Sequence, residues 1–339
     1  MNIAVFGAGS MGTILGACLS RAGFNADLIS RDEAHIGALK AVGAWICGTV
    51  SFSTPPFDGK KGRGLALLPS EMDKEYDIIF LLTKQADNAA TAAMLKKFIA
   101  PNGMVCTMQN GFPDQLLEDI LGRDRVLGCI CVWGGTKVAD GVVDLTSKPG
   151  SMVFILDGKP RPMLQNVKEI LEKVCAVKVE PNFTGSRWSK LLLNAAFSGL
   201  SAVSGCSFGE LASGRRSGEL VLFVIKECIE VCRASGISIA PVQGKFSADF
   251  LYCDNPLKKT LLMFVMPIAM KNHYAIKSGW LGDIDRGRAC EVDFISGAVS
   301  RAGRECNVPT PLNDRIVEIV HSIERGERKY GLENLELFH

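Results

Sequence analysis

The first twelve residues carry the pattern that most constrains this chain. Residues 3–6 are apolar and include β-branched types, as expected of a buried parallel strand. Gly7, Gly9 and Gly12 follow with the spacing G-x-G-x-x-G, and residues 13–22 then have a helical pattern. In this arrangement the first glycine permits a tight turn, the second lets the backbone approach a pyrophosphate, and the third lets the helix pack closely. The sequence therefore predicts a dinucleotide site formed by Gly7, Ala8, Gly9, Ser10, Met11 and Gly12; the alternative is a purely structural glycine turn.

Length and composition exclude several classes of protein. A chain of 339 residues with 47% hydrophobic residues can form about two domains with large cores. The net charge is +2 without a clustered basic face, so no nucleic-acid partner is expected. The apolar run 261–270 is too short to span a bilayer, and no signal peptide is recognisable, so no membrane association is expected.

The cysteines and histidines favour a cytoplasmic protein without a metal site. The chain has 12 cysteines but no C-x-x-C pair, which in a chain of this size indicates reduced thiols within a core. The four histidines, at 35, 273, 321 and 339, are widely spaced.

The second predicted strand, residues 25–30, bears on the choice of cofactor. An acidic residue at the end of this strand is typical of NAD binding, whereas this strand is followed by Arg31. Its guanidinium suits a 2′-phosphate, which favours NADP(H). Asp32 could face the same ribose, and Arg31 could instead be a solvated loop residue.

Two further strands, residues 77–83 and 104–108, bring polar residues to the same edge of the predicted sheet. In open α/β sheets, ligands bind beyond the carboxyl ends of the strands. Lys84 is therefore predicted to meet a cofactor phosphate or ribose, and Asn110 to meet the cofactor or substrate. The alternatives are a surface lysine and an ordinary Asn-Gly turn.

The remaining elements complete an α/β class prediction with two domains. We expect a Rossmann-like dinucleotide-binding domain at 1–182, followed by an all-helical domain at 183–339. In the first domain the pattern predicts turns and edge strands over 43–74, including Gly62-Arg63-Gly64, a helix over 86–99, a strand over 126–133, antiparallel strands over 141–146 and 151–156, a helix over 163–174 and a strand over 177–179. In the second it predicts helices near 185–204, 208–213, 216–235, 241–251, 263–276, 288–305 and 311–325.

Polar residues in two apolar helical stretches suggest catalysis. Lys190, Asn194 and Ser198 share one helical face, because they are spaced by four residues. A lysine in such a helix would have a lowered pKa and act as an acid near neutrality, although it could instead snorkel to water. Glu291 is predicted early in the helix over 288–305. There it could pair with Lys190, or it could simply interact favourably with the positive end of the helix dipole.

Taken together, these motifs resemble the ketopantoate reductase family, within the wider 6-phosphogluconate dehydrogenase-like group. The matching segments, in family order, are Gly7-x-Gly9-x-x-Gly12, Arg31, Thr83-Lys84-Gln85, Gln109-Asn110-Gly111, Trp188-x-Lys190-x-x-x-Asn194 and Asp283-x-x-x-Gly287-Arg288-x-x-Glu291-Val292-Asp293. The resemblance implies NADPH-dependent reduction of a small 2-oxo acid, ketopantoate or a related compound, to a 2-hydroxy acid. It implies that Lys190 donates the proton and that Glu291 positions the lysine and the cofactor ribose. It also places Asn110 and Asn194 near the nicotinamide and the substrate.

The substrate-orienting positions depart from the family pattern. Ser198 and Phe208 stand where asparagines are expected, and the expected serine aligns with Gly279, beside Ser278. We therefore expect Ser198 and Ser278 to contact a substrate that differs from ketopantoate and is bulkier or more apolar. A β-hydroxy-acid or opine dehydrogenase and a non-catalytic NADP(H) sensor are the alternatives. The apolar helical half is compatible with a homodimer.

Overall fold

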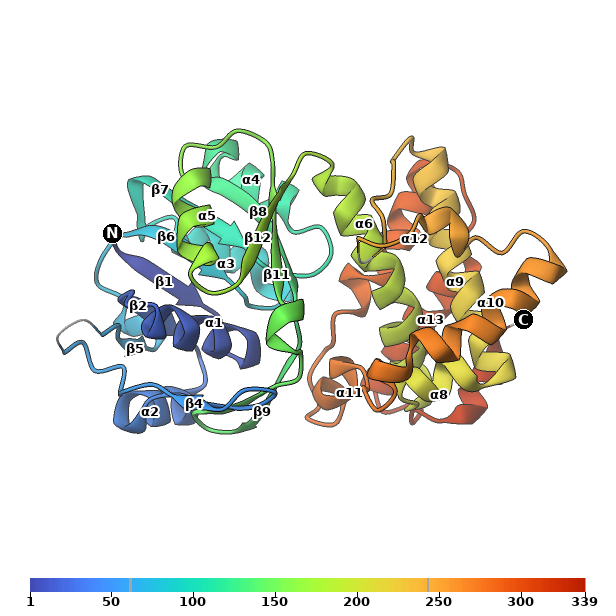
Figure 1. The fold of residues 1–339 in the computed structure, drawn as a ribbon, viewed down its shortest axis with the longest axis horizontal. Helices are drawn as coiled ribbons and strands as arrows, with labels where there is room; N and C mark the ends of the chain where they lie inside the picture. The colour runs from blue at the N-terminus through green and yellow to red at the C-terminus, as the bar shows by residue number, and fades with distance from the viewer. Residues whose placement is uncertain (61–62, 243, 339) are drawn as a thin grey trace. The chain divides into compact units, whose positions relative to one another are not determined.

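The computed structural model describes residues 1–60, 63–242 and 244–338, in which the chain forms two compact units (Figure 1). The N-terminal unit comprises Met1–Gln109 and Pro113–Phe183, and the helical unit comprises Asn110–Phe112 and Thr184–His339. The expectations for Gly62, for the part of the 241–251 helix at Gln243, and for His339 lie outside the described residues.

The N-terminal unit is built on an eight-stranded sheet. Its strand order is β12-β11-β8-β7-β6-β1-β2-β5, and all neighbouring pairs are parallel except β8 with β11. The strands, from one edge to the other, are β12 (Ala176–Glu180), β11 (Val153–Asp157), β8 (Val126–Val132), β7 (Ile99–Thr107), β6 (Tyr76–Leu81), β1 (Ile3–Phe6), β2 (Ala26–Ile29) and β5 (Ala66–Leu67). This is the doubly wound α/β class expected from the sequence, which is therefore confirmed.

Helices cover both faces of this sheet, because successive side chains of its central strands point to opposite sides. Val5 and Phe80 belong to one core with helices α1 (Ser10–Arg21) and α5 (Leu164–Glu172). Ala4 and Ile79 belong to a second core with helices α3 (Asn88–Leu95) and α4 (Asp114–Leu121) (Figure 1). A strand buried on both faces must be apolar throughout, which explains the continuous hydrophobic runs of β1 and β6.

A smaller sheet corrects one of the predicted strand pairings. It has the order β4 (Phe52–Ser53), β3 (Trp45–Gly48), β10 (Val142–Leu145) and β9 (Gly135–Ala139). The expectation that 141–146 pairs with 151–156 is wrong: β10 pairs with β3 and β9, whereas β11 pairs with β8 and β12. Residue alternation shows that a segment is extended but does not select its partner, and β9 was not predicted.

A second correction concerns the connection between α3 and β7. The predicted helix over 86–99 is shorter, with a 3₁₀ turn at Gln85–Asp87 followed by α3, and β7 begins at Ile99 rather than at residue 104. Pro101-Asn102-Gly103 resembles a turn but lies within β7. A Cβ at Gly103 would lie 2.6 Å from the carbonyl oxygen of Tyr76, so close packing against the neighbouring strand explains this glycine.

The helical unit packs its helices around one large core. The helices are α6 (Phe183–Leu193), α7 (Gly199–Ser204), α8 (Phe208–Ser213), α9 (Arg215–Ala234), α10 (Pro256–Ala269), α11 (Gly279–Ile284), α12 (Ser296–Glu305) and α13 (Pro311–Glu324). Extended pairing among its described residues is limited to one bridge, Val242 with Phe246. Across the described part of the chain, no helix combines the length and hydrophobicity needed to cross a membrane.

Three predicted helices of this unit are wrong. The helix predicted near 263–276 is α10, which begins at Pro256 and ends at Ala269. The described residues of the 241–251 segment contain the Val242–Phe246 bridge and a 3₁₀ turn, Ala248–Phe250, instead of an α-helix. The predicted helix over 288–305 begins only at Ser296, and α11 was not predicted. Glu291 therefore lies before α12 and directly precedes a 3₁₀ turn, Val292–Phe294; the neighbouring Cys290 amide donates to the side chain of Glu324 (2.7 Å).

Candidate active site

The glycine turn after β1 has the geometry that its spacing predicts. Gly7 adopts a φ of +102°, and the amides of Gly7 and Ala8 both donate to the carbonyl oxygen of Ile29, each at 2.9 Å. A Cβ at Gly12 would lie 2.3 Å from the Gly7 carbonyl oxygen. Gly7 and Gly12 are thus required by the protein's own backbone, one for its conformation and one for close packing.

Gly9 differs from the other two glycines. A Cβ at this position would meet no atom within 4 Å, so the fold itself does not require a glycine there. Gly9 is also the N-cap of α1, whose first-turn amides have no carbonyl partners within the helix. An open approach beside the positive end of a helix fits a dinucleotide pyrophosphate.

Arg31 and Asp32, at the end of β2, have different environments. Arg31 is exposed and forms an ion pair with Asp87 (2.6 Å). The Asp32 carboxylate caps helix α2 (Glu33–Val42) by accepting from the His35 amide (3.1 Å), and it pairs with Lys137 of β9 (2.7 Å). The hydrogen bond from Lys137 lowers the pKa of Asp32. The Asp32 carboxylate therefore binds the helix amide and Lys137, a lysine that was not predicted from the sequence to have a role.

A buried hydrogen-bond chain connects the glycine turn to the smaller sheet. His35 is only 1% exposed; its Nδ1 accepts from the Gly141 amide (3.1 Å), and its Nε2 lies 2.9 Å from Thr13 Oγ1. Thr13 Oγ1 in turn lies 3.4 Å from the Ala8 carbonyl oxygen. Because Nδ1 is an acceptor, the neutral ring carries its proton on Nε2. Burial lowers the pKa of His35.

The residues beyond β6 and β7 are held by amide hydrogen bonds. Gln109 donates to the Thr83 carbonyl oxygen (2.7 Å), and it exchanges hydrogen bonds with the Asn88 side chain at 2.7 and 3.1 Å. Lys84 is exposed and directly precedes the 3₁₀ turn Gln85–Asp87. The buried Gln109 thus fixes the chain beside Lys84, at the sheet edge where a cofactor is expected.

The segment Asn110–Phe112 belongs to the helical unit, although it follows β7 in the sequence. The Gly111 carbonyl oxygen accepts from Arg187 (2.8 Å), and the Phe112 ring lies 5.2 Å from that of Trp188. Both partners lie on α6, close to Lys190. The predicted site residue Asn110 is therefore held next to the helix that carries the predicted catalytic lysine.

The polar residues predicted on this helix form a partly accessible stripe. From Gly185 to Ser204, all residues are buried except Lys190, Leu193, Asn194 and Ser198, which are half-buried. The chain is α-helical up to Leu193, π-helical over Asn194–Ser198, and α-helical again in α7. The π turn was not foreseen, and such turns are frequent at functional sites.

Phe208 and Trp280 both pack in the core of the helical unit. The ring of Phe208 lies 5.5 Å from that of Phe197, within the π-helical turn, and Trp280 is buried in the core of this unit. Ser278 is buried: its hydroxyl accepts from the Trp280 amide (3.2 Å) and its own amide donates to Ser201 Oγ (3.1 Å). Ser278 thus caps α11.

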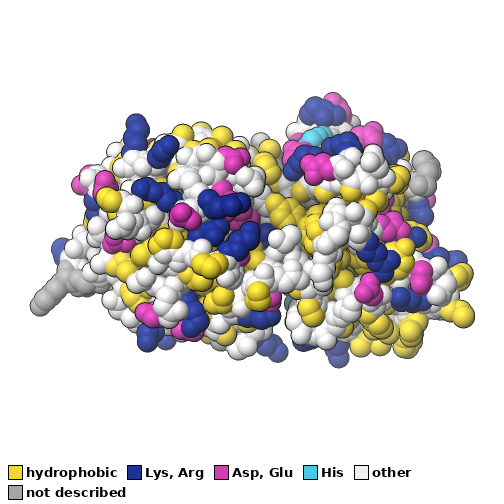
Figure 2. All heavy atoms as spheres, turned by 90° about the horizontal axis from the view of Figure 1, so that it is seen from above, with side chains coloured by type: hydrophobic (Ala, Val, Ile, Leu, Met, Phe, Trp, Pro, Cys, Tyr) yellow, Lys and Arg dark blue, Asp and Glu magenta, His cyan; other side chains and the backbone are white. Residues whose placement is uncertain are grey.

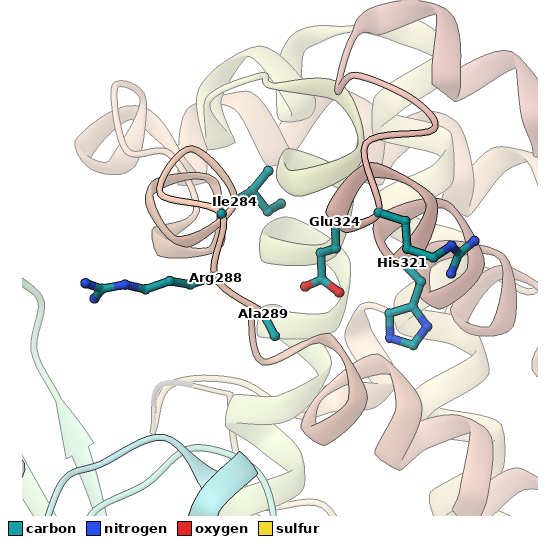
Figure 3. A pocket seen from close by; sticks show the side chains of 7 residues that line it. Ile284, Arg288, Ala289, His321 and Glu324 are labelled. Atoms are coloured by element: carbon teal, nitrogen blue, oxygen red, sulfur yellow. The ribbon is translucent and has the colours of Figure 1, made fainter.

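Glu291 lies on a segment that α13 anchors on both sides. Before it, the Cys290 amide donates to Glu324; after it, Asp293 lies 3.1 Å from His321. Glu324 and His321 line a pocket of about 230 Å³, from which the Arg288 side chain extends away (Figure 3). These contacts are structural, and they hold the loop that carries Glu291.

Comparison with known proteins agrees with this geometry. A family model described as ketopantoate reductase PanE/ApbA matches residues 3–155, and the corresponding C-terminal model matches residues 182–324. A 2-dehydropantoate 2-reductase from Archaeoglobus fulgidus is 25% identical over 96% of this chain and 98% of its own length.

Solved structures show the same fold over nearly the whole chain. A PanE/ApbA family ketopantoate reductase from Ralstonia eutropha has a TM-score of 0.78 at 24% identity, covering 96% of this chain and 99% of its own. A D-mandelate dehydrogenase with NADH and anilino(oxo)acetate has a TM-score of 0.77 at 22% identity, with the same coverage. The chain therefore belongs to the ketopantoate reductase PanE/ApbA family and is a 2-dehydropantoate 2-reductase-like oxidoreductase.

Proposed function

We propose that this protein uses NADPH to reduce a 2-oxo acid with an apolar substituent to the 2-hydroxy acid, with Lys190 as the proton donor. The observation that carries the proposal is the half-buried stripe of Lys190, Asn194 and Ser198 on a largely buried helical segment. On this partly accessible face, a lysine and an asparagine can contact a polar ligand.

The glycine turn fits the proposed cofactor, since Gly9 leaves open the approach that a pyrophosphate needs. When bound, a reduced nicotinamide supplies hydride to a carbonyl carbon. The Lys190 ammonium transfers a proton to the carbonyl oxygen, and its charge stabilises that oxygen as negative charge develops on it. Asn110 and Asn194 orient the nicotinamide and the substrate, and Glu291 positions Lys190 and the cofactor ribose.

The preference for NADPH over NADH is supported by the end of β2. Arg31 is exposed there and can rotate from its surface ion pair with Asp87 to a 2′-phosphate, since such exposed pairs contribute little free energy. Asp32 would repel a phosphate, but its charge is compensated by Lys137 at 2.7 Å. Lys84 supplies a second cation for the cofactor.

The apolar substituent is supported by what replaces the family's amides. Phe208 packs on Phe197 near the polar stripe, and Ser198 offers one hydroxyl in place of an amide. A site that lacks those amides loses the hydrogen bonds that would select a hydroxylated substrate such as ketopantoate. The D-mandelate dehydrogenase of the same fold was solved with an aromatic oxo acid.

A substrate panel tests this proposal. Purified protein is incubated with NADPH and, separately, with ketopantoate, phenylglyoxylate and branched aliphatic 2-oxo acids, and the loss of absorbance at 340 nm is followed. We expect turnover, with a higher kcat/KM for the apolar acids than for ketopantoate. Preferred turnover of ketopantoate contradicts the substrate class, and tight NADPH binding without turnover of any acid contradicts reductase activity.

A further inference from the structure

Two buried polar side chains lie between the glycine turn and the smaller sheet of the N-terminal unit. His35 is 1% exposed and Thr13 is 0% exposed. Figure 2, by contrast, shows charged side chains of both signs at the surface of this unit. A polar side chain inside a core costs free energy unless its donors and acceptors are matched. The hydrogen-bond partners of His35 and Thr13 therefore explain why the fold tolerates them.

The hydrogen bonds of this pair run in one direction. An amide can only donate, so the Gly141 amide donates to His35 Nδ1 (3.1 Å) and the neutral ring carries its proton on Nε2. Nε2 donates to Thr13 Oγ1 (2.9 Å), and the Thr13 hydroxyl then donates to the Ala8 carbonyl oxygen (3.4 Å). Gly141 is itself anchored in the smaller sheet, because its carbonyl oxygen accepts from the Trp45 amide (2.8 Å).

The other end of this chain is the peptide group between Ala8 and Gly9. Its N–H donates to the Gly7 carbonyl oxygen (2.8 Å), and its carbonyl oxygen accepts from Thr13, so both polar atoms of the peptide are held. The peptide directly precedes the α-carbon of Gly9, where an added Cβ would meet no atom within 4 Å. A tilt of this peptide would therefore change the open surface that a pyrophosphate approaches.

We propose that His35 is a positioning residue for the cofactor: through Thr13 it fixes the Ala8–Gly9 peptide in the orientation that receives the pyrophosphate. The inference rests on the proposed binding of NADPH, and it assigns a role to a residue of the interior. A turn that is already fixed loses little conformational entropy when a ligand binds to it, which strengthens binding.

Thr13→Val tests this role, because valine keeps the shape of threonine and removes the hydroxyl. We expect the NADPH Kd, measured by fluorescence titration, to rise about 3- to 10-fold, as for the loss of one hydrogen bond. Thr54→Val is the matched control, since Thr54 is also buried and its hydroxyl accepts from the Ala44 amide (2.9 Å). The control should keep the Kd within about two-fold of the wild type. Urea denaturation establishes that both variants are folded.

Two substitutions of His35 separate hydrogen bonding from packing. His35→Leu fills the interior without hydrogen bonds, and it should raise the NADPH Kd about as much as Thr13→Val. His35→Gln has an amide that can both accept and donate, so it should keep the Kd within about two-fold of the wild type. Combining His35→Leu with Thr13→Val should add little to the larger single effect, because both substitutions break the same chain.

Hydrogen exchange of the cofactor-free protein gives an independent readout. We expect the amides of residues 7–12 to exchange about 3- to 10-fold faster in Thr13→Val than in the wild type, and at the wild-type rate in Thr54→Val. A wild type that binds no NADPH overturns the cofactor site itself and this inference with it.

Three results overturn the positioning role alone when the wild type binds NADPH. The first is an unchanged NADPH Kd in both Thr13→Val and His35→Leu. The second is an equal rise of the Kd in Thr54→Val. The third is a His35→Gln variant that binds NADPH as weakly as His35→Leu.

Discussion

Replacing Gly9 with alanine should weaken cofactor binding and leave the stability of the fold almost unchanged. The added Cβ meets no protein atom within 4 Å, and the local φ of −83° is accessible to alanine. Alanine is a poorer N-cap than glycine, but it also restricts the unfolded chain. These effects oppose each other, so we expect the free energy of unfolding to change by less than about 1 kcal/mol.

Cofactor affinity should change much more. A methyl group at the point of closest backbone approach would displace the pyrophosphate and remove at least one charge-assisted hydrogen bond, worth about 1.5–3 kcal/mol. That loss corresponds to a rise in the NADPH Kd of about 10- to 100-fold. Fluorescence titration gives the Kd, and urea denaturation gives the stability.

Two other glycines provide controls for Gly9→Ala. Gly37→Ala, at an exposed position of helix α2, also adds a Cβ with nothing within 4 Å, and it should leave the NADPH Kd unchanged. Gly12→Ala places a Cβ 2.3 Å from a backbone oxygen and should destabilise the fold by about 1–3 kcal/mol. An unchanged Kd in Gly9→Ala, or an equal loss of affinity in Gly37→Ala, would refute the assignment of this turn to the pyrophosphate.

Three further predictions follow from the contacts described. Lys137→Met should lower the preference for NADPH over NADH by about 5- to 10-fold, because the uncompensated charge of Asp32 would repel the 2′-phosphate by about 1 kcal/mol. Adding Asp32→Asn, which keeps the helix cap, should restore the preference. Cofactor titrations measure both changes. Burial lowers the pKa of His35 in the folded protein, so below about pH 6.5 the unfolded chain binds more protons than the folded one. The urea concentration at the unfolding midpoint should therefore decrease as the pH is lowered. His35→Gln, which can still accept from Gly141, should reduce this dependence. Phe208→Asn should raise kcat/KM for ketopantoate relative to phenylglyoxylate. An unchanged ratio of the two kcat/KM values would show that Phe208 does not select the substrate.

Local sequence patterns were sufficient for the central elements of the fold. β1, α1 and β6 are recognisable because strands buried on both faces must be apolar throughout, and because the glycine spacing fixes the turn between β1 and α1. Pro101-Asn102-Gly103 misled the prediction, since its local preference for a turn is overridden by pairing of β7 with β6. The pairing of β10 with β3 joins residues about a hundred positions apart and leaves no local signal.

The same limit applies to the candidate site. Lys190 was proposed as a site residue because a lysine in an apolar helix departs from the local pattern, and this remains a prediction. Lys137 and His35 were missed because their roles depend on distant partners: Lys137 on Asp32, and His35 on the Gly141 amide and Thr13. Candidate cofactor residues at a sequence motif can therefore be proposed from the sequence, whereas contacts between residues far apart in the sequence, such as Lys137 with Asp32, require the fold.

The most direct test of the proposed reaction is the single-turnover rate of NADPH oxidation in Lys190→Met, measured with the preferred 2-oxo acid from the panel. The substitution keeps an unbranched side chain, one heavy atom shorter than that of lysine, and removes the proton donor. We predict a rate about 10²- to 10⁴-fold below that of the wild type, with an NADPH Kd within two-fold of the wild-type value. A rate within a few-fold of the wild type would contradict the role of Lys190 as the proton donor.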